Sequence, residues 1–88
     1  MRRAVRWQSR ARDDLRDVAR SDPGTARRIS TAVDRFAEHG VGDIKKLHGA
    51  AGDWRLPVGD WRVRFRLDPD NGAVVVLRVL PRGRAYRD

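Results

Sequence analysis

The chain has 88 residues, with 20 Lys and Arg against 12 Asp and Glu, and a formal net charge of +8. This length suits a single domain with one modest core, and the positive balance favours a polyanionic or acidic partner. The absence of cysteine excludes disulfides, thiolate catalysis and Cys-ligated metals. No apolar run reaches transmembrane length and the N-terminus lacks the apolar region of a signal peptide, so we expect a cytoplasmic protein.

The N-terminal half predicts a short strand followed by two amphipathic helices, over residues 3–7, 10–20 and 24–39. Asp22 can cap the second helix with Pro23 at its first position, and Gly40 can end it. Three arginines lie off the apolar stripe of the second helix and are interpreted as a solvated face: Arg27, Arg28 and Arg35.

The C-terminal half predicts three successive antiparallel strands, over residues 54–58, 61–67 and 73–81. Gly59-Asp60 suits a two-residue turn, and Asn71-Gly72 is a strong hairpin signal because both residues tolerate positive φ. Before these strands, residues 41–51 are interpreted as a loop with a short strand at 44–47. The order β-α-α-β-β-β predicts one α+β domain over residues 1–88, with two helices packed on one face of an antiparallel sheet.

The strand at 61–67 alternates apolar residues with arginines. Side chains of a strand point to opposite faces in turn, so one face of this strand is apolar and the other is cationic. The apolar face is expected to hold ten residues: Trp54, Leu56, Val58, Trp61, Val63, Phe65, Leu67, Val75, Leu77 and Val79. The cationic face is expected to gather six: Arg55, Arg62, Arg64, Arg66, Arg78 and Arg82.

The six arginines allow two interpretations. They can simply keep the open face of an antiparallel sheet soluble. However, no acidic residue alternates with the arginines of the strand at 61–67, and like charges opposite one another destabilise a sheet. An outside partner would compensate them, so we interpret this face as an anion-binding surface. The two histidines and scattered aspartates show no metal-ligand spacing, so we expect no metal site and no cofactor.

Three segments carry a resemblance to a known family: GDIKKLHG at 42–49, WRLPVGDWRVRF at 54–65 and VLPRGRAYR at 79–87. They resemble the RelE/ParE toxin superfamily of bacterial toxin–antitoxin systems, with its usual G-D-V-K-K-L-x-G, Y-R-L-R-V-G-D-Y-R-V-x-Y and V-x-H-R-x-x-x-Y. The resemblance covers nearly the whole chain, and its G-D-[YW]-R core is more specific to the fold than to one activity. Pro57 replaces the second basic residue of the pattern, and Pro81 replaces the histidine.

The resemblance implies alternative activities. RelE-type toxins cut mRNA in the ribosomal A site, whereas ParE-type toxins poison DNA gyrase; a member that has lost catalysis would only bind its antitoxin. Carried over by motif, the acting residues of the RelE branch are Arg55, Arg62, Arg82 and Tyr86. The expected RNA-binding residues are Lys45, Lys46, Arg64, Arg66, Arg78 and Arg84. The implied partners are ribosome-bound mRNA, or alternatively gyrase, and an acidic antitoxin encoded nearby.

Cleavage of RNA without a metal needs a group that takes the proton of the 2′-hydroxyl, a stabilised phosphate and a protonated leaving oxygen. Arginines stabilise the phosphate well but are poor proton carriers. The candidate bases are Tyr86, His48 and His39. Nearby cations favour the phenolate form of Tyr86, although stacking on a base is an equal alternative role for its ring. The choice between Tyr86 and His48 stays open, and His39 is interpreted as a helix C-terminal residue.

Overall fold

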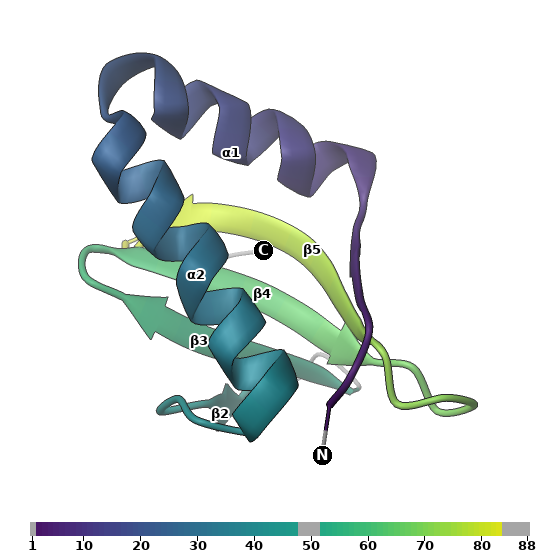
Figure 1. Cartoon of the computed structure of the whole chain (residues 1–88). Helices are drawn as coiled ribbons and strands as arrows, with labels where there is room; N and C mark the ends of the chain where they lie inside the picture. The colour runs from purple at the N-terminus through teal and green to yellow at the C-terminus, as the bar shows by residue number, and fades with distance from the viewer. Residues whose placement is uncertain (1, 48–51, 84–88) are drawn as a thin grey trace.

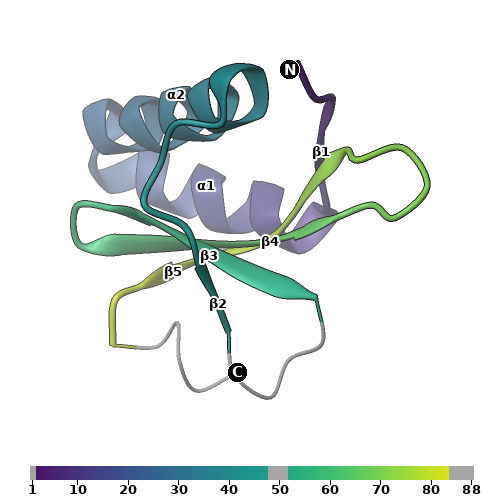
Figure 2. The same cartoon turned by 90° about the horizontal axis from the view of Figure 1, so that it is seen from below.

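The computed structural model describes residues 2–47 and 52–83. Its elements are β1 (Val5–Trp7), α1 (Ser9–Ser21), α2 (Pro23–His39), β2 (Lys45–Lys46), β3 (Asp53–Val58), β4 (Trp61–Leu67) and β5 (Val74–Pro81). The strands form one sheet in the order β1-β5-β4-β3-β2, and both helices cover the same face of it (Figures 1 and 2). The predicted α+β class and helical layer are confirmed. No helix in the described residues is long and apolar enough to cross a membrane.

The predicted boundaries of α2 follow from its capping residues. Asp22 accepts hydrogen bonds from the backbone N–H of Thr25 at 3.1 Å and from its hydroxyl at 2.6 Å, and proline occupies the first turn. These two bonds, and then the charge of Arg28, lower the pKa of Asp22. At the other end, Gly40 adopts a φ of 69° and donates its N–H to the carbonyl of Phe36.

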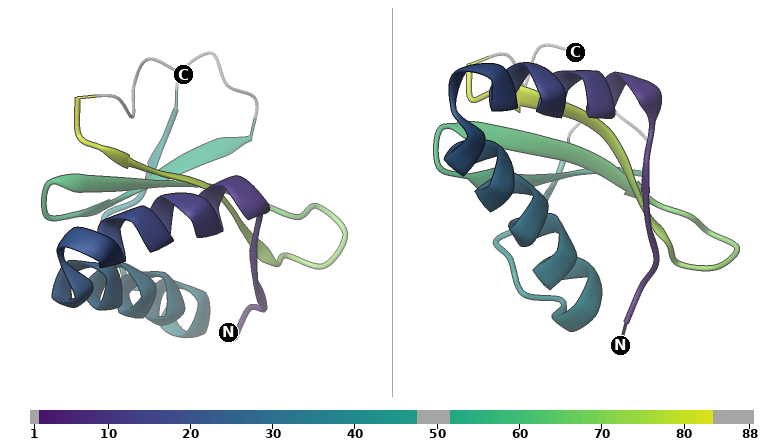
Figure 3. Two further views of the ribbon diagram at one scale, coloured as in Figure 1. Left: turned by 90° about the horizontal axis from the view of Figure 1, so that it is seen from above. Right: turned by 45° about the horizontal axis from the view of Figure 1, so that its top comes forward.

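The core lies between the helices and the sheet. α1 packs mainly on β5, while α2 packs on β3 and touches β1 (Figure 3). The rings of Phe36 and Phe65 meet at a centroid distance of 5.1 Å, and Ile29, Val33 and Val63 are fully buried around them. Burying a side chain of this size contributes about 1.5–3 kcal/mol, so this layer supplies most of the hydrophobic stabilisation. It leaves the opposite face of the sheet uncovered by helices.

The sheet is antiparallel except at one pair. β1 runs parallel to β5, with Val5 opposite Val74 and Trp7 opposite Val76. Parallel neighbours need a long connection, and every element from α1 to β4 lies between these two strands in the chain. The pairing with β1 ends at Val76. Beyond Val76, the carboxylate of Asp14 binds the same edge of β5. It accepts the N–H of Val79 at 2.9 Å and Nε of Arg78 at 2.8 Å.

A β-bulge in β5 changes which of its residues face the core. Arg64 pairs with Arg78 and Phe65 pairs with Val76, so Leu77 is an extra residue on β5. One extra residue inverts the alternation of side chains on its N-terminal side. The prediction that Val75 and Leu77 lie on the apolar face was therefore wrong, and Val74 and Val76 occupy that face instead. The assignment of Val79, which follows the bulge, was correct.

The two predicted hairpins form, with different turns. Val58 pairs with Trp61 and Gly59 has a φ of 58°, as the two-residue turn requires. The second turn is longer than the Asn71-Gly72 signal predicts, because Asp68 donates its N–H to the carbonyl of Ala73. Among the residues of this turn only Gly72 has a positive φ.

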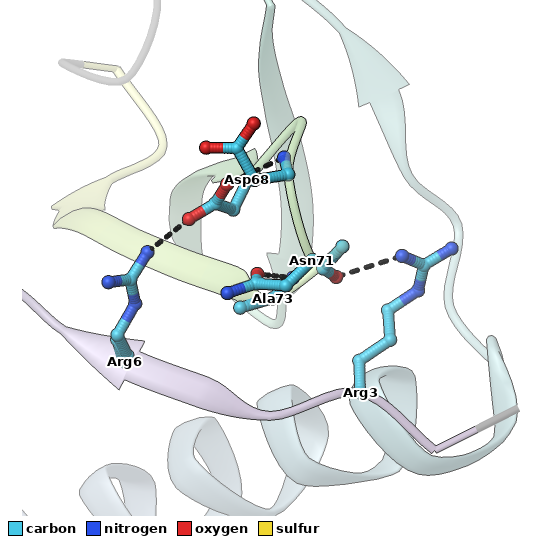
Figure 4. A network of polar contacts seen from close by, with 7 residues as sticks. Arg3, Arg6, Asp68, Asn71 and Ala73 are labelled. Atoms are coloured by element: carbon cyan, nitrogen blue, oxygen red, sulfur yellow. Dashed lines mark hydrogen bonds and ion pairs between the residues drawn. The ribbon is translucent and has the colours of Figure 1, made fainter.

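Two arginines near the N-terminus, Arg3 and Arg6, bind this second turn (Figure 4). Nη2 of Arg6 lies 2.6 Å from Oδ2 of Asp68, and Nη1 of Arg3 donates to the carbonyl oxygen of Gly72 at 2.8 Å. A Cβ on Gly72 would lie 2.8 Å from that same Nη1. The close approach of Arg3 and the positive φ both explain glycine at this position.

Candidate nucleic-acid interface

A row of four cations crosses the face of the sheet that the helices leave uncovered. Lys45 of β2 lies opposite Arg55, Arg55 lies opposite Arg64, and Arg64 lies opposite Arg78. Directly opposed like charges destabilise a sheet. Negative charge or a bound ligand on this face would therefore stabilise the row.

Asp53 of β3 compensates the centre of this row. Its carboxylate accepts hydrogen bonds from Nη2 of Arg64 at 3.2 Å and from Nε and Nη2 of Arg66 at 3.1 and 2.8 Å. The Asp53 side chain is only 6% exposed, so water screens these contacts weakly. Asp53 was not among the residues predicted on this face, although it shares the parity of Arg55 on the same strand.

Asp14 compensates the β5 end of the row. Its Oδ2 lies 2.8 Å from Nε of Arg78, and both side chains are largely buried. This carboxylate comes from α1, in the helical layer, and no pattern in the strands points to it. The two carboxylates thus provide partners for three of the six arginines predicted on this face: Arg64, Arg66 and Arg78.

Three cations near the β3–β4 turn and on β2 form no ion pair within the described residues: Lys45, Arg62 and Arg82. Nη1 of Arg62 donates to the carbonyl oxygens of Gly59 and Trp61, both at 2.8 Å. The backbone N–H of Arg82 donates to the carbonyl of Asp60 at 2.9 Å. The two arginines are therefore held at the same turn.

The electrostatics of Arg62 show that its charge is poorly compensated. Burial, and then the charges of Arg82 and Arg55, lower the pKa of Arg62, while Asp60 opposes them. Its Nε is buried without a hydrogen-bond acceptor in the described part of the chain. A bound phosphate would supply both a counter-charge and an acceptor. The structure therefore brings Arg55, Arg62 and Arg82 into one electrostatic cluster that can bind an anion.

The remaining predicted residues differ in their exposure. Arg66 keeps 51% of its side chain exposed despite its ion pair, whereas Arg64 keeps 10%. Lys46 is exposed and lies opposite Trp54. His39 is exposed at the end of α2, 3.6 Å from Glu38. Three predicted residues lie outside the described residues: His48, Arg84 and Tyr86.

The described residues hold no group of three or more side chains with metal-ligating chemistry. Leu80 is buried on the cationic face, opposite Arg62, where no apolar residue was predicted. Its place on this face follows from strand alternation, because Leu80 shares the parity of Arg78 on the C-terminal side of the bulge.

Comparisons with known proteins agree with this fold. The model of a family described as ParE toxin of type II toxin–antitoxin system, parDE, matches residues 5–86. The toxin–antitoxin complex RelBE2 from Mycobacterium tuberculosis contains a chain 30% identical to this one, with a TM-score of 0.62 over 93% of this chain and 100% of that chain. Among curated protein sequences none matches significantly.

Two further solved structures resemble this chain. In the archaeal RelE–RelB complex from Pyrococcus horikoshii, the matching chain is 24% identical with a TM-score of 0.73, covering 97% of this chain and 100% of that chain. The YoeB/ParE toxin from Agrobacterium tumefaciens is 18% identical with a TM-score of 0.75, covering 89% and 96%. At these identities both likenesses concern the fold.

Proposed function

This chain belongs to the ParE toxin family of type II toxin–antitoxin systems, and from that premise we propose that it is a ribosome-dependent mRNA endoribonuclease that inhibits translation. The observation that carries the proposal is the electrostatic cluster of Arg55, Arg62 and Arg82, in which Arg62 and Arg82 are bonded to the β3–β4 turn. A site that only kept the sheet soluble would not need a half-buried arginine whose pKa is lowered by burial and by two neighbouring arginines.

In this proposal Arg62 and Arg82 bind the scissile phosphate and stabilise the negative charge that grows on it during attack by the 2′-hydroxyl. Arg55 adds to the positive field from the neighbouring strand. Tyr86 takes the proton of the 2′-hydroxyl or stacks on a base, with His48 as the alternative proton acceptor. The attack forms the bond between the 2′-oxygen and phosphorus of a cyclic phosphate and breaks the bond to the 5′-oxygen, which takes a proton from water and leaves as a hydroxyl.

We assign the other predicted cations to RNA binding rather than to the chemistry. Lys45 and Lys46 are exposed on the edge strand and are free to contact phosphates. Three further arginines are each paired with a carboxylate: Arg64, Arg66 and Arg78. The pairing reduces the positive field that each presents to RNA, so each contributes less to RNA binding. We also assign Arg84 to RNA binding, from its position in the sequence.

The proposal includes a cognate antitoxin in the cytoplasm. The solved relatives from P. horikoshii and M. tuberculosis are toxin–antitoxin complexes. A chain with a net charge of +8 fits an acidic, partly disordered antitoxin that lays a helix or a strand across the cationic face. Such an association is fast and sensitive to salt.

A second function is favoured by the family match itself, because the matching family is named for ParE toxins. In that case the cationic face would bind DNA gyrase without cleaving RNA. A member that has lost catalysis and only binds its antitoxin is the third alternative.

Induced expression in bacteria separates these functions. The proposed nuclease stops protein synthesis while mRNA is cut inside codons, and cutting requires translation of that mRNA. A gyrase poison instead stops replication and induces the SOS response while mRNA remains intact. A chain that does neither, yet binds its antitoxin, contradicts both toxic activities.

A further inference from the structure

The β3–β4 turn is reached by an arginine from the helical layer as well as by those of the sheet. An ideal Cβ placed on Gly59 would lie 4.0 Å from Nη2 of Arg28 on α2. The carbonyl of the same Gly59 accepts from Arg62, and the carbonyl of Asp60 accepts from Arg82. Figures 1 and 2 show this turn at the end of the sheet nearest to the first turns of α2. Arginines from both sides of the molecule therefore converge on one turn.

Arg28 also borders a hollow on the outer side of α2. This hollow has a volume of about 470 Å³ and is lined by Gly24, Arg27, Arg28, Thr31, Ala32 and Arg35. Arg28 lies 3.5 Å from the hydroxyl of Thr25 and within the field of Asp22. Arg27 and Arg35 form no ion pair within the described residues. The hollow is thus a cationic surface that continues from the β3–β4 turn.

We propose that the anion-binding site extends around the β3–β4 turn onto α2, with Arg28 as the residue that joins the two surfaces. Its ligand is a single-stranded RNA long enough to place one phosphate at Arg62 and Arg82 and another beside Arg28. This inference rests on the proposed function and adds to it a second phosphate-binding position. From the sequence, Arg28 is interpreted as part of a solvated face, because the pattern of α2 alone does not indicate the nearby turn.

A single strand suits this path better than a duplex. The path bends from one face of the sheet to the helical layer, and a duplex resists bending over short distances. A cationic groove that follows the backbone is typical of proteins that bind single strands, and arginine planes can also stack on unpaired bases. Each phosphate contact on a single strand adds about 0.7 to the slope of log K against log salt concentration.

The test measures fluorescence anisotropy of labelled single-stranded RNA oligonucleotides of about 4 to 16 nucleotides, a range typical of single-strand sites. The RNA carries 2′-O-methyl groups, so it cannot be cleaved through its 2′-hydroxyl. The variants are Arg28→Gln and Arg62→Gln, with Arg10→Gln as the control. Arg10 is an exposed arginine in the first turn of α1 and forms no ion pair within the described residues. Thermal unfolding verifies that each variant is folded.

We expect Arg62→Gln to weaken binding at every length. Arg28→Gln should leave the shortest RNA unaffected, weaken binding of the longer ones, and lower their salt slope by about 0.7. The inference is overturned if Arg28→Gln behaves like Arg10→Gln at all lengths, and the cationic face then remains the whole site. If wild type binds no RNA of any length, the inference also fails, while mRNA cleavage in cells decides the proposed function separately.

Discussion

Asp53 lies opposite Arg66 in the sheet and accepts hydrogen bonds from its Nε and Nη2, at 3.1 and 2.8 Å. The same carboxylate also accepts a bond from Arg64 at 3.2 Å. One buried negative charge thus serves two arginines in the middle of the cationic face. It allows β3 and β4 to pair although Arg55 and Arg64 oppose each other.

Replacing Asp53 with asparagine should destabilise the fold. The change keeps the size of the side chain but removes the only carboxylate that contacts Arg64 in the described residues. Breaking a buried ion pair costs about 3 kcal/mol in the free energy of unfolding. Denaturant titration measures this cost. Asp13→Asn is the matched control, because the ion pair of Asp13 with Arg16 is exposed and contributes little. Equal stabilities of the two variants would contradict this role of Asp53.

Replacing Arg82 with alanine should abolish most mRNA cleavage without unfolding the domain. Arg82 is exposed and forms no ion pair in the described residues, so its side chain adds little to stability. Loss of one such electrostatic contact typically lowers a rate by about 10²–10³. Arg62→Ala should lower the rate similarly, and Arg10→Ala should leave it unchanged. The assay is cleavage of mRNA on purified ribosomes. Full activity in Arg82→Ala would place the chemistry elsewhere.

Replacing Tyr86 with phenylalanine separates the two roles proposed for its ring. Stacking on a base survives the change, whereas proton transfer requires the hydroxyl. If the hydroxyl acts as the base, we expect a loss of about 10²–10⁴ in the cleavage rate. Single-turnover cleavage on ribosomes measures this rate, with binding verified separately. A rate equal to that of wild type assigns Tyr86 to stacking and leaves His48 as the candidate base.

Replacing Gly72 with alanine should destabilise the β4–β5 hairpin. The residue has a φ of 72°, and the new Cβ would lie 2.8 Å from Nη1 of Arg3. We expect a loss of about 1–2 kcal/mol, the usual cost of a left-handed conformation for a residue with a Cβ. Gly83→Ala is the control, because its Cβ would have no neighbour within 4 Å. Both changes are compared by thermal unfolding, and equal effects would exclude strain at Gly72.

The cap of α2 predicts a dependence of stability on pH. Hydrogen bonds from Thr25 lower the pKa of Asp22 below its usual value of 3.8. A group whose pKa is lowered on folding stabilises the protein above its unfolded pKa, and this contribution is lost as the pH falls through the folded pKa. Asp22→Asn keeps an acceptor for the N–H of Thr25 but cannot titrate. The free energy of unfolding of wild type should therefore fall more steeply than that of Asp22→Asn as the pH falls below about 4. Parallel curves would contradict this.

The sequence predicted the architecture because its periodicities are strong. α2 was predicted from its helical spacing, from Asp22-Pro23 at its start and from Gly40 at its end. The alternation of β4 predicted that Arg62 lies on the face opposite the helices. The sequence of β5 shows no comparable alternation. Its residues 74–77 are apolar on both parities, so alternation could not reveal the bulge that places Val76 in the core.

The candidate site was predictable only in part. Arg55, Arg62 and Arg82 share a face through strand parity, which a sequence shows directly. Asp14 and Arg28 belong to the helical layer and reach β5 and the β3–β4 turn only after the helices pack on the sheet. In the sequence, Asp14 resembles its exposed neighbour Asp13, and Arg28 resembles Arg27. Tertiary packing distinguishes them, and no local pattern encodes it.

The carboxylate of Asp14 on the outer edge of β5 has a consequence for solubility. Exposed sheet edges invite pairing with strands of other molecules and so promote aggregation. Here the N–H of Val79 is already bonded to Asp14, and Pro81 has no N–H to offer. The outermost strands are also short, because β1 has three residues and β2, at the opposite edge, has two, both lysines. The protein can therefore keep one bare, arginine-rich sheet face without its edges becoming templates for aggregation.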